Sequence, residues 1–129
     1  MSFKTIAIIT AVVAFALACA YFFVGELVVG RWQIQPTESV LLFGRRIGSL
    51  YLGLSVMYYL ARSSPVSVAR TALSAGTAVA LSVLALLGIY EVAVGHAGPG
   101  LMVSVAVESL LALAYIRVLL TERKVILPG

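Results

Sequence analysis

The chain has 129 residues, enough for one domain, and 62% of them are hydrophobic while only 11% are charged. Soluble globular domains average roughly 45–50% apolar and about 25% charged residues, so this excess predicts contact with lipid. The net charge of +4 does not indicate nucleic-acid binding, because the basic residues are scattered among apolar runs without a recognition motif. The single cysteine, Cys19, and the single histidine, His96, exclude an intrachain disulfide and a site with two histidine ligands from one chain.

Four segments are apolar enough to cross a bilayer, since a transmembrane helix needs about 20 mostly apolar residues for a hydrocarbon core about 30 Å thick. They cover residues 5–29, 40–61, 69–94 and 100–120. Short connections between them make consecutive helices antiparallel neighbours. We therefore predict an all-α polytopic membrane protein, with one domain over residues 1–129 that forms an antiparallel bundle of four transmembrane helices.

The first segment also has features of a secretory signal. Lys4 precedes the apolar run, residues 18–20 (ACA) resemble a cleavage site, and residues 16–19 loosely resemble a lipoprotein box. The apolar run continues through residues 21–24, however, and this favours a retained helix.

Proline, serine and glycine mark the connections before the other three segments. Thr37 or Ser39 is a candidate cap for the second helix, and Ser63 or Ser64 for the third. The run GHAGPG at residues 95–100 breaks the chain before the fourth segment, and Pro99 suits a first helical turn.

Every predicted helix carries small residues at helical spacing, which allow close packing in lipid, where apolar burial gives little drive for association. On the fourth helix Ser104, Glu108 and Ala112 share one face. The stripes predict a compact bundle with its small residues inward, although some of them could instead dock a partner subunit. The stripes of the first three helices consist of Ala7, Ala11, Ala14 and Ala18, then Gly44, Gly48 and Gly53, then Ala72, Gly76 and Ala80.

Basic residues predict the orientation, because cytoplasmic loops of membrane proteins carry an excess of lysine and arginine. The side with both termini holds six of them, and the other side holds three. Both termini are therefore expected in the cytoplasm, with the protein in the cytoplasmic (inner) membrane. The six are Lys4, Arg62, Arg70, Arg117, Arg123 and Lys124, and the three are Arg31, Arg45 and Arg46.

Charged groups inside the bilayer are costly, at roughly 2.5–3.5 kcal/mol for Arg, Lys or Asp at a helix centre, so Glu108 and Arg46 are the most informative residues. Counting from the midpoint of each helix, at about 1.5 Å per residue, places their side chains within roughly 3 Å in depth. We therefore predict a buried Arg46–Glu108 pair that fixes helix register. Alternatively, Arg46 extends to the headgroups or binds a ligand, and Glu108 is a protonated carboxyl or a proton or cation site.

A polar group is predicted at the outer side, formed by Glu26, Arg45, Glu91 and His96. Together with Arg46 and Glu108 it would make the outer half of the interior polar and leave the inner half apolar. Aromatic residues suit the two membrane interfaces, and Tyr51 with Tyr90 is a conceivable lipid or quinone pocket. The interfacial aromatics are Trp32 and Tyr90 on the outer side and Tyr58, Tyr59 and Tyr115 on the inner side.

A family resemblance rests on the second and fourth segments. FGRRIG at residues 43–48, followed by YLGL at 51–54, resembles the second helix of DoxX-like proteins and related uncharacterised small four-helix bacterial families. Gly98-Pro99-Gly100 followed by Glu108 is similar to their final helix, so the resemblance covers residues 40–116. It implies a four-helix membrane fold with Arg46 and Glu108 as polar elements, and in some members a link to quinone-dependent sulfur oxidation.

Three functions follow from these patterns. The first is a non-catalytic accessory or assembly subunit of a larger membrane complex, favoured by the short loops and by the lack of nucleophile–base sets and metal-ligand clusters in the sequence. The second is a small oligomeric transporter or channel that uses Glu108 and Arg46, and the third is a quinone-linked redox subunit. We predict no catalytic residues, cofactor or nucleic-acid partner; the expected partners are the bilayer and other membrane subunits or a second copy.

Overall fold

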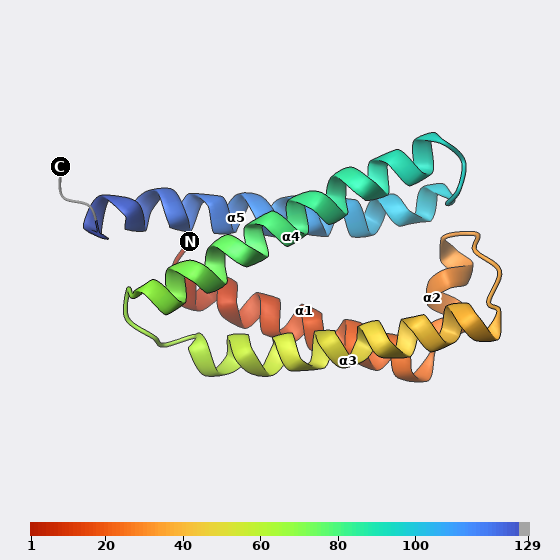
Figure 1. The fold of residues 1–129 in the computed structure, drawn as a ribbon, viewed down its shortest axis with the longest axis horizontal. Helices are drawn as coiled ribbons and strands as arrows, with labels where there is room; N and C mark the ends of the chain where they lie inside the picture. Colours follow the sequence, from red (N-terminus) through yellow and green to blue (C-terminus); the bar gives the residue numbers. More distant parts are fainter. Residues whose placement is uncertain (127–129) are drawn as a thin grey trace.

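The fold is all-α in a computed structural model that describes the backbone of residues 1–126 and the side chains of residues 1–122. Four of its helices are long and apolar enough to cross a membrane, and the described residues contain no strand. The predicted four-helix membrane fold is thereby confirmed (Figure 1). The elements are α1 (Phe3–Phe23), α2 (Gly25–Arg31), α3 (Glu38–Ala61), α4 (Val68–Ala93), the 3-10 turn η1 (Pro99–Leu101) and α5 (Met102–Ile126).

Local capping explains where the helices begin. Thr37 caps α3 by accepting the N–H three residues further on, as predicted. Ser67, rather than Ser63 or Ser64, caps α4 in the same way, because residues 62–66 are needed to reverse the chain after α3. Pro99 occupies the start of η1, where its missing N–H leaves no donor unsatisfied.

The first predicted segment, residues 5–29, is not one helix. Val24 has a non-helical backbone (φ −133°, ψ 33°), and it separates α1 from α2. The 21 residues of α1 span about 31 Å at about 1.5 Å per residue, which is close to the thickness of the hydrocarbon core. The break turns α2 across the end of the bundle (Figure 1).

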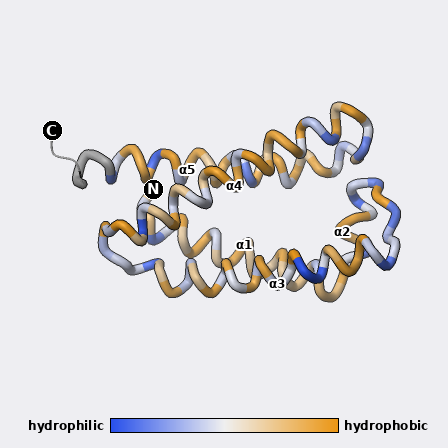
Figure 2. The backbone as a smooth tube through the Cα atoms, in the orientation of Figure 1, coloured by the Kyte–Doolittle hydropathy of each residue, from blue (hydrophilic) through white to orange (hydrophobic). Residues whose placement is uncertain are grey.

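The long helices form two pairs rather than one evenly packed bundle. α1 packs along α3, and α4 packs along α5, whereas α3 and α4 make almost no backbone contact. The pairs meet at the end that carries the N-terminus, here called the terminal end, and diverge toward the opposite end, called the α2 end (Figure 1). Hydrophobic residues dominate all four long helices, and hydrophilic residues gather at the connections and in one stretch within α3 (Figure 2).

Small residues pack α1 against α3. The four alanines of the α1 stripe are at most 5% exposed. A Cβ at Gly44 or Gly48 would lie 3.1 Å from a carbon of Tyr21, so both glycines allow α1 to approach α3 closely. The stripe on α4 behaves differently: Ala72, Gly76 and Ala80 are exposed, as is Gly53 on α3, and this departs from the expected inward packing.

On α4, the face that packs against α5 includes Gly88. A Cβ at Gly88 would lie 2.6 Å from a methyl group of Val105, so the two helices approach closely there. The other buried residues of α4 are Ser74, Thr77, Ala78 and Ala85. Residue spacing alone did not distinguish this face from the exposed stripe, because both repeat with helical periodicity.

The terminal end has a polar network inside its apolar core. Tyr58 and Tyr115 are fully buried, with ring centroids 5.5 Å apart. Tyr115 shares a 2.7 Å hydrogen bond with Thr10, and Tyr58 donates to Thr77 and to the carbonyl of Leu73, at 3.3 Å. Tyr58 and Tyr115 are therefore core residues rather than interface anchors, and the prediction of an apolar inner half was wrong. The network joins α1 to α5 and α3 to α4.

An ion pair completes the terminal end. Arg70 on α4 pairs with Glu122 on α5, and their side chains are 15% and 8% exposed. Arg70 also donates to the carbonyl of Ser64 at 2.7 Å and lies over the ring of Phe3, 4.1 Å from its centroid. The sequence pattern treats Arg70 only as a charge that sets topology, and Glu122 lies beyond the predicted fourth segment.

Candidate functional site

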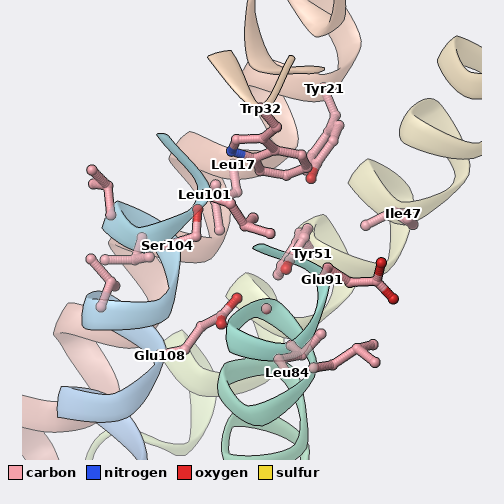
Figure 3. Close-up of a pocket in the computed structure, with 15 residues that line it drawn as sticks. Leu17, Tyr21, Trp32, Ile47, Tyr51, Leu84, Glu91, Leu101, Ser104 and Glu108 are labelled. Carbon is pink, nitrogen blue, oxygen red and sulfur yellow. The ribbon is translucent and has the colours of Figure 1, made fainter. Parts of the chain in front are cut away.

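A cavity of about 460 Å³ lies between the two helix pairs. Residues of α1, α3, α4, α5 and η1, together with Trp32, line it (Figure 3). Most of the lining is aliphatic, with contributions such as Leu17, Ile47 and Leu84 from three different helices. The polar and aromatic lining residues are Tyr21, Trp32, Tyr51, Glu91, Ser104 and Glu108.

The cavity is partly open at its side. A second groove of about 340 Å³ runs between α3 and α4 and shares Tyr51 and Leu84 with the cavity. Its wall on α4 includes the exposed Ala72, Gly76 and Ala80. The groove therefore adjoins the cavity, on the side where α3 and α4 make few backbone contacts.

At the α2 end, Gly98 joins the two helix pairs. The N–H of Gly98 donates to the carbonyl of Trp32 at 2.7 Å. A Cβ at Gly98 would lie 2.6 Å from the side chain of Gln33, and Gln33 itself has a left-handed backbone (φ 58°). The sequence pattern identifies the 95–100 connection only as a helix break, whereas the structure uses it as a contact that places Trp32 at the cavity.

An aromatic wall faces the interior of the cavity. Tyr21 on α1 and Tyr51 on α3 are stacked, with ring centroids 6.1 Å apart and planes 6° from parallel. Gly44 and Gly48 leave the space that Tyr21 occupies against α3. Glycine spacing in α3 therefore positions a residue of the site, a role that the sequence pattern did not assign to Tyr21.

Glu108 provides a carboxyl group within the apolar lining. It lies in the first half of the membrane span Pro99–Glu122, on the same side of α5 as Ser104, and its side chain lines the cavity (Figure 3). Among the described side chains it has no hydrogen-bond or ion-pair partner. One turn further along α5, Ala112 is buried in the helix packing, so Glu108 lies where packing gives way to the cavity.

The structure does not bring Arg46 to Glu108. Arg45 and Arg46 are both exposed on α3, and the ion pairs found among residues 1–122 are Arg70–Glu122 and His96–Glu91. Helical geometry explains the difference, since about 100° per residue separates successive side chains. Gly44 and Gly48 face α1 and Ile47 and Tyr51 face the cavity, which leaves Arg46 on the far side of the helix. Counting residues estimates the depth of a side chain along the helix axis, but it gives no information on the rotation of the helix about that axis.

The predicted outer polar group is only partly assembled. Nδ1 of His96 lies 2.8 Å from a carboxylate oxygen of Glu91, and Glu91 also lines the cavity. Glu26 and Arg45 are exposed and lie in no ion pair within the described part of the chain. The predicted Tyr51–Tyr90 pocket is also not formed, because Tyr90 is exposed and Tyr51 stacks on Tyr21 instead.

Nothing in the described residues gathers three or more His, Cys, Asp or Glu side chains that could hold a metal ion. No protein-family model, curated protein or solved structure matches the chain. The cavity and its carboxyl group are therefore the basis on which a function can be argued.

Proposed function

We propose that this small membrane protein is a carrier that binds a small apolar or amphiphilic molecule in the cavity between its helix pairs. The observation that carries the proposal is a cavity of about 460 Å³ with Glu108 in its wall. Ligand sites commonly measure about 300–1,000 Å³ and combine an apolar lining with a few convergent polar groups. An ionisable residue within a membrane span marks a functional site by default.

Packing supports a role for the empty space. Protein interiors are normally filled to the density of organic crystals, yet here the pairs are joined at both ends and separated between them. The Tyr58–Tyr115 network joins them at the terminal end, and the Gly98–Trp32 hydrogen bond joins them at the α2 end. This arrangement keeps a space open at the depth of Glu108.

Filling the cavity tests the proposal. Ser104→Phe places a ring in the cavity, whereas Leu110→Phe makes a matched change at a position on α5 that is 69% exposed. Native mass spectrometry of protein released from its own membrane should show a retained small molecule, and Ser104→Phe should lose it while Leu110→Phe keeps it. Equal retention by both variants would contradict the proposal, as would an empty unmodified protein that shows no flux of any substrate after reconstitution.

An accessory or assembly subunit is the second candidate function. The unfilled groove between α3 and α4 favours it, because small residues on α4 would let a partner helix approach closely. A Cβ at Gly76 would meet nothing within 4 Å, so Gly76→Leu should block docking without disturbing the chain itself. Purification in mild detergent should then show a larger complex for the unmodified chain and its loss in Gly76→Leu; migration of the unmodified chain alone would contradict this role.

We also propose the orientation and the family connection that the sequence predicts. Cytoplasmic termini rest on the six-to-three distribution of basic residues, of which Arg123 and Lys124 have side chains outside the described residues. A DoxX-like, quinone-linked role rests on the resemblance of residues 40–116, and binding of a quinone in the Tyr21–Tyr51 wall, followed by its reduction beside a partner enzyme, would support it.

A further inference from the structure

The charged residues that line the cavity have one sign. Glu91 and Glu108 are acidic, and no Lys, Arg or His is among the described residues of the lining. Arg45 and Arg46 lie near the cavity in sequence but are exposed on α3 and do not line it. Electrostatic interactions strengthen in a medium of low dielectric constant, so the cavity disfavours an anion and favours a cation.

The two carboxyl groups are in different situations. Glu91 already contacts His96 at the α2 end. Glu108 has no such partner within the described residues and projects into the cavity (Figure 3). Glu108 is partly exposed to the cavity, and a carboxylate in an apolar lining attracts a nearby cation more strongly than it would in water. Glu108 is therefore the group that a cationic ligand would complement.

Aromatic rings supply the second half of such a site. Tyr21 on α1, Tyr51 on α3 and Trp32, which directly follows α2, line the same cavity as Glu108 (Figure 3). The faces of aromatic rings attract cations, most strongly where water is excluded, and sites for quaternary ammonium groups are built from such rings. The aliphatic remainder of the lining, including Val13 and Leu87, suits the apolar part of the same ligand.

We infer that the cavity selects lipophilic cations, namely protonated amines and quaternary ammonium or phosphonium compounds, with the charged centre between Glu108 and the Tyr21–Tyr51 wall. This inference rests on the proposed function, because it names the substrate class of the same cavity. Glu108 is then the residue that discriminates between ligands by charge. The aromatic wall offers apolar contact to any ligand and, in addition, attracts a cationic one.

Trp32 is the only tryptophan of the chain and lines the cavity, so its fluorescence reports occupancy. The probes are tetraphenylphosphonium, the nearly isosteric anion tetraphenylborate, and neutral triphenylmethanol, each titrated against protein in nanodiscs. Comparing each probe between variants cancels its partition into lipid. The variants are Glu108→Gln, Tyr51→Leu and the control Glu26→Gln, which makes the same charge change at an exposed position on α2.

Tetraphenylphosphonium should quench Trp32 saturably. Tetraphenylphosphonium has no hydrogen-bond donor, so its attraction to Glu108 is Coulombic. Loss of that attraction should weaken binding about tenfold or more in Glu108→Gln, while Glu26→Gln leaves it unchanged. Triphenylmethanol should bind the Glu108→Gln variant as it binds the unmodified chain. Tyr51→Leu, which keeps Glu108, should weaken the cation more than the neutral probe, and circular dichroism should show that each variant is folded.

Failure of the inference differs from failure of the proposed function. If the neutral probe binds as well as the cation, or if Glu108→Gln leaves the cation's affinity unchanged, the assignment of cations is overturned while ligand binding stands. Saturable quenching by tetraphenylborate alone would also overturn it. If no probe quenches Trp32 saturably and Ser104→Phe changes nothing in native mass spectrometry, both conclusions are overturned.

Discussion

The Arg70–Glu122 pair gives a quantitative test of how the terminal end is held together. Arg70→Met leaves Glu122 buried, with a carboxylate whose Oε2 already lacks a partner among the described residues. Breaking a buried pair by removing one member costs about 3–5 kcal/mol. Glu122→Leu should cost less, about 1–3 kcal/mol, because Arg70 keeps the Ser64 carbonyl and the Phe3 ring.

The double variant Arg70→Met/Glu122→Leu tests whether the two residues stabilise the protein as a pair. Replacing both charges with apolar side chains leaves no uncompensated charge, so its free energy of unfolding should lie within about 1 kcal/mol of the unmodified protein. Unfolding in mixed micelles by increasing dodecyl sulfate, followed by far-UV circular dichroism, measures all four proteins. If the double variant instead loses the sum of the two single losses, the residues do not act as a pair and the assignment is refuted.

Three further predictions concern packing, hydrogen bonding and topology. A double-mutant cycle of Thr10→Val and Tyr115→Phe, which removes the 2.7 Å hydrogen bond between α1 and α5, should give a coupling of about 0.6 and at most about 1.7 kcal/mol; zero coupling would argue against the bond. Gly88→Ala pushes a Cβ against α5 and should lower the free energy of unfolding by about 1–3 kcal/mol. Gly76→Ala places a Cβ that meets nothing within 4 Å, so it should be neutral or stabilising. Equal effects of the two substitutions would contradict the packing described. A C-terminal green fluorescent protein fusion should fluoresce while an alkaline phosphatase fusion stays inactive, and the reverse result would invert the orientation.

Features set by local chemistry were predictable. The four membrane spans follow from length and hydropathy, because a chain in lipid must satisfy its backbone hydrogen bonds within each helix. The Thr37 cap depends on contacts three residues apart. The Gly44–Gly48 spacing predicted a close approach, and both glycines are buried against α1.

Features set by tertiary packing were not predictable from one sequence. The spacing of Ala72 and Gly76 resembles that of buried stripes, yet these residues line an open groove, since nothing in the spacing says which helix faces which. The Arg46–Glu108 prediction failed to specify rotation about the helix axes. A tyrosine such as Tyr58 suits a membrane interface and a protein core equally well. Its place in the core depends on a hydrogen bond to Thr77, which is distant in sequence.

The groove between α3 and α4 determines how the affinity for a ligand should depend on the length of its alkyl chain. A ligand that arrives through the groove comes from the hydrocarbon of the bilayer and not from water. Each CH₂ group added to its alkyl chain favours partition into the bilayer by about 0.8 kcal/mol. The same group gains little on entering the cavity, because the cavity wall is as apolar as the lipid. Affinity expressed per mole fraction of lipid should therefore be flat across a homologous series, although affinity expressed per aqueous concentration rises steeply. If the chain is a carrier, as proposed, its selectivity depends on the polar end of the ligand rather than on the length of the alkyl chain.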